Sequence, residues 1–188
     1  MFRRPSLKTV RWRPLEGEGL EHLTIGPADG IPIRATSVLI GERGRRPYGV
    51  RYTIDCDAAW TVMSFSIDTT DGQRLAMTSD GKGHWRDASG THLPAFNGCI
   101  DIDLAGTPFT NTLPIRRLGL KPKDGTAKLT MLFVPFDTFE PFPDGQNYTC
   151  LEEDRLYRYE AEDRSFNVDL PVDEDGLVMD YPTLFKRL

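Results

Sequence analysis

Asp101 and Asp103 are the residues of this sequence whose spacing most clearly suggests chemistry. They share one parity of an alternating segment whose other parity is apolar, which predicts a β-strand with two carboxylates on one face. Residues 107–114, rich in hydroxyl, amide and proline side chains, predict an ordered loop. Arg116 and Arg117 follow and are expected to fold back onto the carboxylates. We interpret this group either as an ion pair that fixes the loop or as the polar end wall of a ligand cavity.

Glu21 and His22 form a second candidate pair, although adjacent residues of an alternating segment should point to opposite faces. His22 is either a hydrogen-bonded structural residue or a ligand-binding or catalytic one. An enzymatic hypothesis takes Glu21, His22 or Asp103 as acid or base of a hydrolase or isomerase acting on a sugar-containing substrate. The spacing of Asp101 and Asp103 overlaps that of glycosidase carboxylates, but parallel side chains on one strand would not flank a bond.

The sequence predicts no metal site and no cofactor. His84 and His92 match no metal-binding spacing, and there is no P-loop, G-x-G-x-x-G segment or G-x-S-x-G elbow. Cys56, Cys99 and Cys150 are widely spaced, so we expect free thiols in a reducing compartment.

Four aromatic residues on or beside predicted strands are candidates for a ligand-binding face: Trp12, Tyr52, Trp60 and Trp85. Indole and phenol groups stack on sugar rings or acyl chains while offering one hydrogen bond. The alternative is that they are simply core, where large aromatic residues are commonly buried. Asn111, with the carboxylates and the two arginines, would suit sugar hydroxyls or phosphate, because Arg and Asn provide directional donors.

Short alternating segments recur along the whole chain, separated by turn signals such as six Asp-Gly dipeptides. Tight turns favour neighbouring antiparallel strands over helical crossovers. About a dozen strands would strain a flat sheet. We therefore predict one mainly β domain over residues 1–188, with a strongly curved antiparallel sheet shaped as a half-barrel, barrel or sandwich. Helices should be few and short, chiefly at 113–118, and the last strand is expected at 177–181.

Net charge and hydropathy exclude several classes of partner. The 188 residues carry a net charge of −5, and nucleic-acid binders need clustered positive charge. The sequence has neither a signal-peptide h-region nor an apolar run long enough to span a membrane. We therefore expect a cytoplasmic protein with no nucleic-acid partner and no integral membrane segment.

The motif at 99–104 and 107–118 resembles the signature of a bacterial family described as putative glycolipid-binding proteins. Agreement extends over nearly the whole chain, in segments 19–22, 83–85, 146–148, 176–178 and 180–182 and in Tyr52, Asp57 and Trp60. The resemblance implies a curved β-sheet with an apolar concave side, similar in fold to lipoprotein-carrier and lipid-binding proteins.

Our leading hypothesis is non-enzymatic binding of a lipid-like or glycolipid-like ligand in an apolar cavity of the curved sheet. The two alternatives are the hydrolase or isomerase described above and a scaffold or homo-oligomer in which residues 107–118 form a subunit interface. The predicted ligand-binding residues are Trp12, Glu21, His22, Tyr52, Trp60, Trp85, Asp101, Asp103, Asn111, Arg116 and Arg117.

Overall fold

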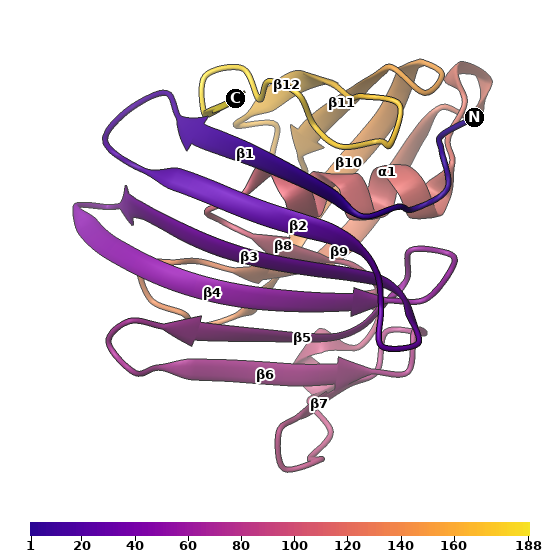
Figure 1. Cartoon of the computed structure of the whole chain (residues 1–188). Helices are drawn as coiled ribbons and strands as arrows, with labels where there is room; N and C mark the ends of the chain where they lie inside the picture. Colours follow the sequence, from indigo (N-terminus) through magenta and orange to yellow (C-terminus); the bar gives the residue numbers. More distant parts are fainter.

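The computed structural model describes residues 1–188 and contains two β-sheets, one α-helix and three short 3-10 helices. Figure 1 shows β1 to β7 as one curved layer with β8 to β12 behind it. The larger sheet, in the order β13-β1-β2-β3-β4-β5-β6-β7, comprises β1 (Lys8–Pro14), β2 (Leu20–Ala28), β3 (Ile31–Arg43), β4 (Arg46–Cys56), β5 (Val62–Thr69), β6 (Arg74–Ser79), β7 (Trp85–Asp87) and β13 (Phe185–Arg187).

The smaller sheet has the order β12-β11-β10-β9-β8. Its strands are β8 (Ile102–Leu104), β9 (Thr126–Val134), β10 (Phe142–Glu152), β11 (Leu156–Ala161) and β12 (Asn167–Pro171). The helices are η1 (Pro94–Phe96), η2 (Pro108–Asn111), α1 (Thr112–Leu118) and η3 (Pro122–Asp124). None of the helices has the length and hydrophobicity needed to cross a bilayer.

Consecutive antiparallel pairings build most of the larger sheet, as the turn signals predict. Asp29 and Gly30 join β2 to β3 with φ angles of 52° and 79°, the left-handed geometry of a tight hairpin. The predicted mainly β architecture with a curved sheet and few short helices is confirmed, with helix α1 close to its expected position.

Three local predictions are wrong. The strand expected from residue 99 begins only at Ile102, and it pairs in parallel with β9, because the connection between them passes through η2, α1 and η3. The Asp144-Gly145 dipeptide lies inside β10 rather than in a turn. The last strand is β13, which pairs with β1, and residues 177–181 form only isolated bridges.

A cluster of 27 buried residues fills the space between the two sheets. Burial along β3 alternates strictly: Ile33, Ala35 and Leu39 of this cluster are buried together with Ser37, and the residues between these four are more exposed. Strand β9 is covered on both sides, because Leu132 packs in this cluster and Met131 in a second one of 10 residues. The protein's own side chains therefore occupy most of the interior that the curved sheet encloses.

Candidate functional site: a pocket beside Glu21

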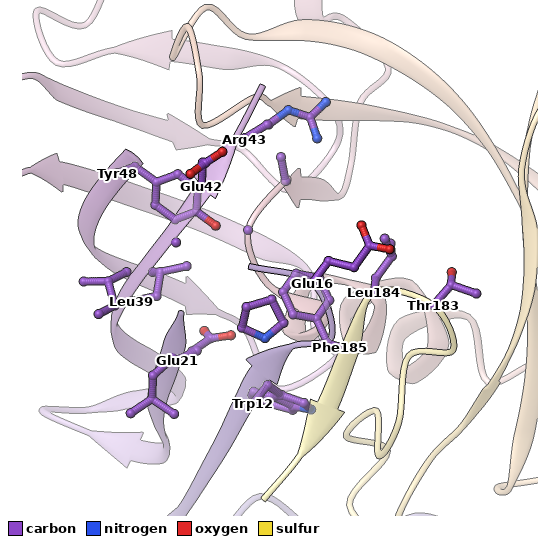
Figure 2. A pocket seen from close by; sticks show the side chains of 16 residues that line it. Trp12, Glu16, Glu21, Leu39, Glu42, Arg43, Tyr48, Thr183, Leu184 and Phe185 are labelled. Carbon is purple, nitrogen blue, oxygen red and sulfur yellow. The ribbon is translucent and has the colours of Figure 1, made fainter. Parts of the chain in front are cut away.

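A pocket of about 200 Å³ lies at one end of the larger sheet, where β1 ends, β2 begins and β3 turns into β4. The loop after β8 and the start of β13 close its other sides (Figure 2). We call it the Glu21 pocket. Its lining residues are Trp12, Pro14, Glu16, Leu20, Glu21, Leu39, Ile40, Gly41, Glu42, Arg43, Tyr48, Ala105, Gly106, Thr183, Leu184 and Phe185.

Glu21 is the buried charged group of this pocket, with 3% of the residue exposed. The alternation of β2 turns its side chain towards the interior, together with Leu23 and Ile25. Oε1 accepts hydrogen bonds from the Tyr52 hydroxyl at 2.6 Å and from the Ser37 hydroxyl at 2.8 Å. Oε2 has no hydrogen-bond partner. Figure 2 shows the carboxyl group directed towards the other residues that line the pocket. A buried oxygen without a partner is an exception in folded proteins.

Burial raises the pKa of Glu21 from 4.5 to about 7, because the low-polarity surroundings disfavour the carboxylate. The hydroxyls of Thr107, Tyr52 and Ser37 oppose this shift. The Thr107 hydroxyl lies near Glu21, and its oxygen also accepts a 3.0 Å hydrogen bond from the backbone N–H of Phe109. The carboxyl group therefore titrates near neutral pH in contact with an open pocket.

Tyr48 places a second polar group in the wall of the pocket. Two glycines accommodate its hydroxyl: a Cβ on Gly41 would lie 2.5 Å from the hydroxyl oxygen, and one on Gly106 would lie 2.9 Å from it. Burial raises the pKa of Tyr48, and the nearby Glu21 raises it further, so the phenol stays protonated. It can therefore donate a hydrogen bond to a ligand or accept one from it.

Trp12 forms the inner wall, fully buried, and its indole Nε1 donates a 3.0 Å hydrogen bond to the carbonyl of Val178. This bond fixes the ring against the C-terminal segment. Phe185 reaches the pocket from β13, which pairs with the strand that carries Trp12. The mouth carries charge of both signs through the exposed Glu16, Glu42 and Arg43. The pocket thus combines aromatic walls with a few polar groups, as small-molecule sites commonly do.

Of the eleven predicted ligand-binding residues, Trp12 and Glu21 line the pocket, and Tyr52 lies directly behind Glu21. His22 lies on the outer face of the same strand, where Arg11 donates to its Nδ1 at 3.1 Å. Trp85 is fully buried and donates to the carbonyl of Cys99 at 2.7 Å.

Arg117 folds back onto Asp101, as one interpretation of the central motif expects. Its Nε donates to Oδ1 at 3.0 Å and its Nη2 to Oδ2 at 2.5 Å, in a bidentate pair with Asp101 only 1% exposed. Burial raises the pKa of Asp101, while the guanidinium lowers it. Arg116 instead donates to the carbonyls of Asp175 and Arg3 and lies 4.5 Å from the ring centroid of Trp60.

Asp103 and Asn111 belong to a separate polar network under the smaller sheet. Asp103 accepts hydrogen bonds from Thr110 at 2.9 Å and from Gln146 at 2.8 Å. Asn111 donates to the hydroxyl of Tyr148 at 3.1 Å. The charged residues of the motif at 99–104 and 107–118 therefore do not line the Glu21 pocket, whereas Ala105 and Gly106, between its two parts, do. A ligand-binding role stays a prediction for all eleven residues, inside the pocket and outside it.

Sequence reasoning missed Tyr48, Gly41, Gly106 and Phe185. Tyr48 belongs to an alternating segment, and nothing in the local sequence distinguishes it from a core residue. The two glycines carry no chemistry of their own, and they matter because they leave room for the Tyr48 hydroxyl. Phe185 joins the site through the pairing of β13 with β1, between residues at opposite ends of the chain.

The sequence of this chain matches the family described as "Putative glycolipid-binding" over residues 9–187. The chain belongs to this family. The match includes every strand residue of the larger sheet apart from Lys8, the first residue of β1. It also includes every residue of the Glu21 pocket. A search of the curated proteins gave no significant match.

Two solved structures resemble this member of the glycolipid-binding family. A DUF1089 family protein from Pseudomonas aeruginosa is 39% identical, with a TM-score of 0.81 over 92% of this chain and 94% of that one. A β-barrel-like protein of the domain of unknown function DUF1849, from Brucella abortus, gives a TM-score of 0.56 at 8% identity, over 100% of this chain and 98% of that one. The second likeness concerns the fold alone.

Proposed function

We propose that this protein binds a glycolipid-like ligand without chemically changing it, and that the sugar or other hydroxyl-rich headgroup occupies the Glu21 pocket. Membership of the glycolipid-binding family supports a binding role. The single structural observation that carries the proposal is the buried Oε2 of Glu21, which has no partner within the protein.

A sugar would satisfy the polar groups of this pocket. One ligand hydroxyl donates to Oε2 of Glu21, and that bond is charge-assisted when the carboxyl group is ionised. The hydroxyl of Tyr48 forms a second hydrogen bond, and the aromatic walls cover an apolar face of the ring. An unpaired buried oxygen costs about 1–3 kcal/mol, so the ligand recovers free energy that the free protein lacks.

The size of the pocket favours a headgroup over a whole lipid. Sites that enclose drug-sized ligands usually measure about 300–1,000 Å³, and this pocket measures about 200 Å³. Side chains fill the interior between the sheets, where the leading hypothesis places an apolar cavity. The proposal therefore assigns the enclosed site to the polar end of the ligand.

An NMR titration with a panel of methyl glycosides of different sugars tests the proposal. We expect at least one to bind, with shifts centred on the residues of the Glu21 pocket. Tyr48→Phe should weaken binding about five- to tenfold, the loss of one hydrogen bond of about 1 kcal/mol. The matched control is Tyr181→Phe, which removes a hydroxyl from the second core cluster. Unchanged affinity in Tyr48→Phe, or no binding across the panel, would overturn the proposal.

One observation supports the enzymatic alternative, and another argues against it. The pKa of Glu21, about 7 beside an open pocket, would suit a general acid or base. Its expected partners do not join it: His22 points to the opposite face of β2, and Asp103 is bound by Thr110 and Gln146. We therefore favour binding without catalysis.

The scaffold alternative expects residues 107–118 at a subunit interface. This segment is instead packed within its own chain, since the residues from Thr107 to Ile115 are buried in the monomer. A homo-oligomer and a cytoplasmic location stay predictions. The three buried free cysteines agree with a reducing compartment.

A further inference from the structure

A shallow groove of about 490 Å³ crosses the outer face of the larger sheet, over the first part of β2, the end of β3 and the start of β4. We call it the outer groove. Three apolar side chains stand exposed along it: Leu20 at 41%, Val38 at 55% and Ile40 at 62%. Its lining residues are Leu20, His22, Val38, Leu39, Ile40, Gly49, Val50, Arg51, Asp68, Thr69 and Thr70.

The register of the sheet gathers these side chains. Leu20 is paired with Ile40, and His22 with Val38, so the apolar residues of two strands form one strip on the outer face. On the next strand Gly49 is paired with Ile40, and the absence of a side chain there leaves room for the side chain of Thr70, which also lines the groove. An outer sheet face normally carries polar residues, so this apolar strip is an exception to the alternation.

The outer groove borders the Glu21 pocket, because Leu20, Leu39 and Ile40 line both. Apolar side chains also lie near the mouth of the pocket, beside the charged Glu16, Glu42 and Arg43. Leu184 lines the pocket and is 42% exposed, and its carbonyl accepts a 2.9 Å hydrogen bond from the backbone N–H of Leu15, which is 48% exposed. Leu20 and Ile40 are thus exposed apolar residues shared by the pocket and the outer groove, and Val38 extends the groove beyond them.

We propose that the outer groove binds the apolar tail of the same amphiphile whose headgroup occupies the Glu21 pocket. This inference rests on the proposed function. The pocket is too small to enclose a long chain, and the interior is filled, so the tail must leave through the mouth. Outside the mouth it meets Leu20 and Ile40, and beyond them Val38. A tail laid on this strip removes its own apolar surface and that of the strip from water.

The ligand class follows from this geometry. The molecule has a compact hydroxyl-rich headgroup and one alkyl or acyl chain that binds along the surface of the sheet rather than inside it. The groove volume of about 490 Å³ lies within the range of small-molecule sites. One side of the tail stays exposed, which suits a protein that collects its ligand from a membrane or delivers it to one.

The test is a series of alkyl glycosides with methyl, hexyl, octyl and decyl chains, measured below their critical micelle concentrations. The sugar is the one that binds most tightly in the methyl glycoside panel. In the wild type, affinity should rise about two- to fourfold per added methylene group. The upper figure corresponds to full burial of each methylene group. Val38→Asp, which changes the groove but not the pocket, should reduce this rise to less than twofold per methylene group.

Leu151→Asp is the matched control, because Leu151 is an exposed apolar residue on β10, in the other sheet. It should keep the wild-type dependence on chain length. The same dependence in Val38→Asp and wild type would overturn the inference. So would a dimer, seen by light scattering, that Val38→Asp dissociates, because the strip would then be a contact between two copies of the chain.

The two proposals fail differently. If the methyl glycoside binds and Tyr48→Phe weakens it, but Val38→Asp leaves the chain-length dependence unchanged, only the tail inference fails. If Val38→Asp weakens the binding of long-chain glycosides but Tyr48→Phe leaves the affinity for the methyl glycoside unchanged, the headgroup proposal fails. If no glycoside of any chain length binds, both fail.

Discussion

The hydroxyl of Tyr52 donates a 2.6 Å hydrogen bond to Oε1 of Glu21, and the second carboxyl oxygen remains unpaired at the pocket. Tyr52 is itself only 1% exposed, so the bond holds the carboxyl group from the protein side. One oxygen of Glu21 is therefore held by the fold, whereas the other has no partner within the protein, and our proposal assigns it to a ligand hydroxyl. The first two predictions depend on this division.

Glu21→Gln should remove a pH-dependent part of the stability. The pKa of Glu21 rises from 4.5 to about 7 on folding, so this carboxyl group contributes stability below pH 4.5 that is lost as pH rises towards 7. The loss amounts to at most about 3 kcal/mol. Gln stays neutral, so the variant should gain stability relative to the wild type between pH 4.5 and 8, as measured by urea unfolding. A constant difference at all pH values would contradict the assigned titration.

Ligand affinity should increase with pH. A ligand hydroxyl that donates to Oε2 prefers the carboxylate, so binding should tighten by up to about tenfold per pH unit below pH 7 and level off above it. Binding should also release protons, which calorimetry in buffers of different ionisation enthalpy detects. Glu21→Gln should show neither effect. Equal pH profiles for variant and wild type would argue that the ligand does not contact Glu21.

Arg117→Ala should be strongly destabilising, by about 3–5 kcal/mol, because it leaves the buried Asp101 carboxylate without its counter-ion. The cost should shrink at low pH, where Asp101 is protonated. Arg158→Ala is the control, since Arg158 also forms two hydrogen bonds with one carboxylate, Asp169, but both side chains are about half exposed. That exposed pair should contribute at most about 1 kcal/mol. Similar decreases in the free energy of unfolding for the two variants, measured with urea, would contradict the assignment of the Arg117–Asp101 pair as a buried ion pair.

Gly106→Ala should destabilise the protein and weaken ligand binding together. The new methyl group would lie 2.5 Å from the ring of the buried Phe136 and 2.9 Å from the Tyr48 hydroxyl. Such overpacking typically costs about 1–3 kcal/mol. In Gly49→Ala the nearest neighbour is the exposed side chain of Thr70, which can rotate away, so the thermal midpoint should fall less. A larger fall of the thermal midpoint in Gly49→Ala than in Gly106→Ala would contradict this prediction.

The strands and hairpins could be predicted from sequence because their signals are local. Alternation along β3 and β4 and the Asp29-Gly30 turn each involve neighbouring residues. The Asp144-Gly145 dipeptide predicts a turn that does not form, because long-range pairing overrides turn propensity. Strand β10 pairs with both β9 and β11, and Gly145 lies beside the side chain of Glu162.

The pocket was only partly predictable. Glu21 and Trp12 were chosen by residue type, but their meeting with Tyr48 and Phe185 depends on strands that pair across the whole chain. Arg117 and Arg116 are adjacent, yet one meets Asp101 and the other packs on Trp60, because successive helical positions face different neighbours. No local pattern encodes that choice.

The most direct measurement is a crystal structure of the protein with the alkyl glycoside that binds most tightly. We predict a sugar hydroxyl within hydrogen-bond distance of Oε2 of Glu21, the Tyr48 hydroxyl against the same ring, and the alkyl chain leaving between Leu20 and Ile40. A sugar bound elsewhere, with the Glu21 pocket holding only water, would contradict the central claim.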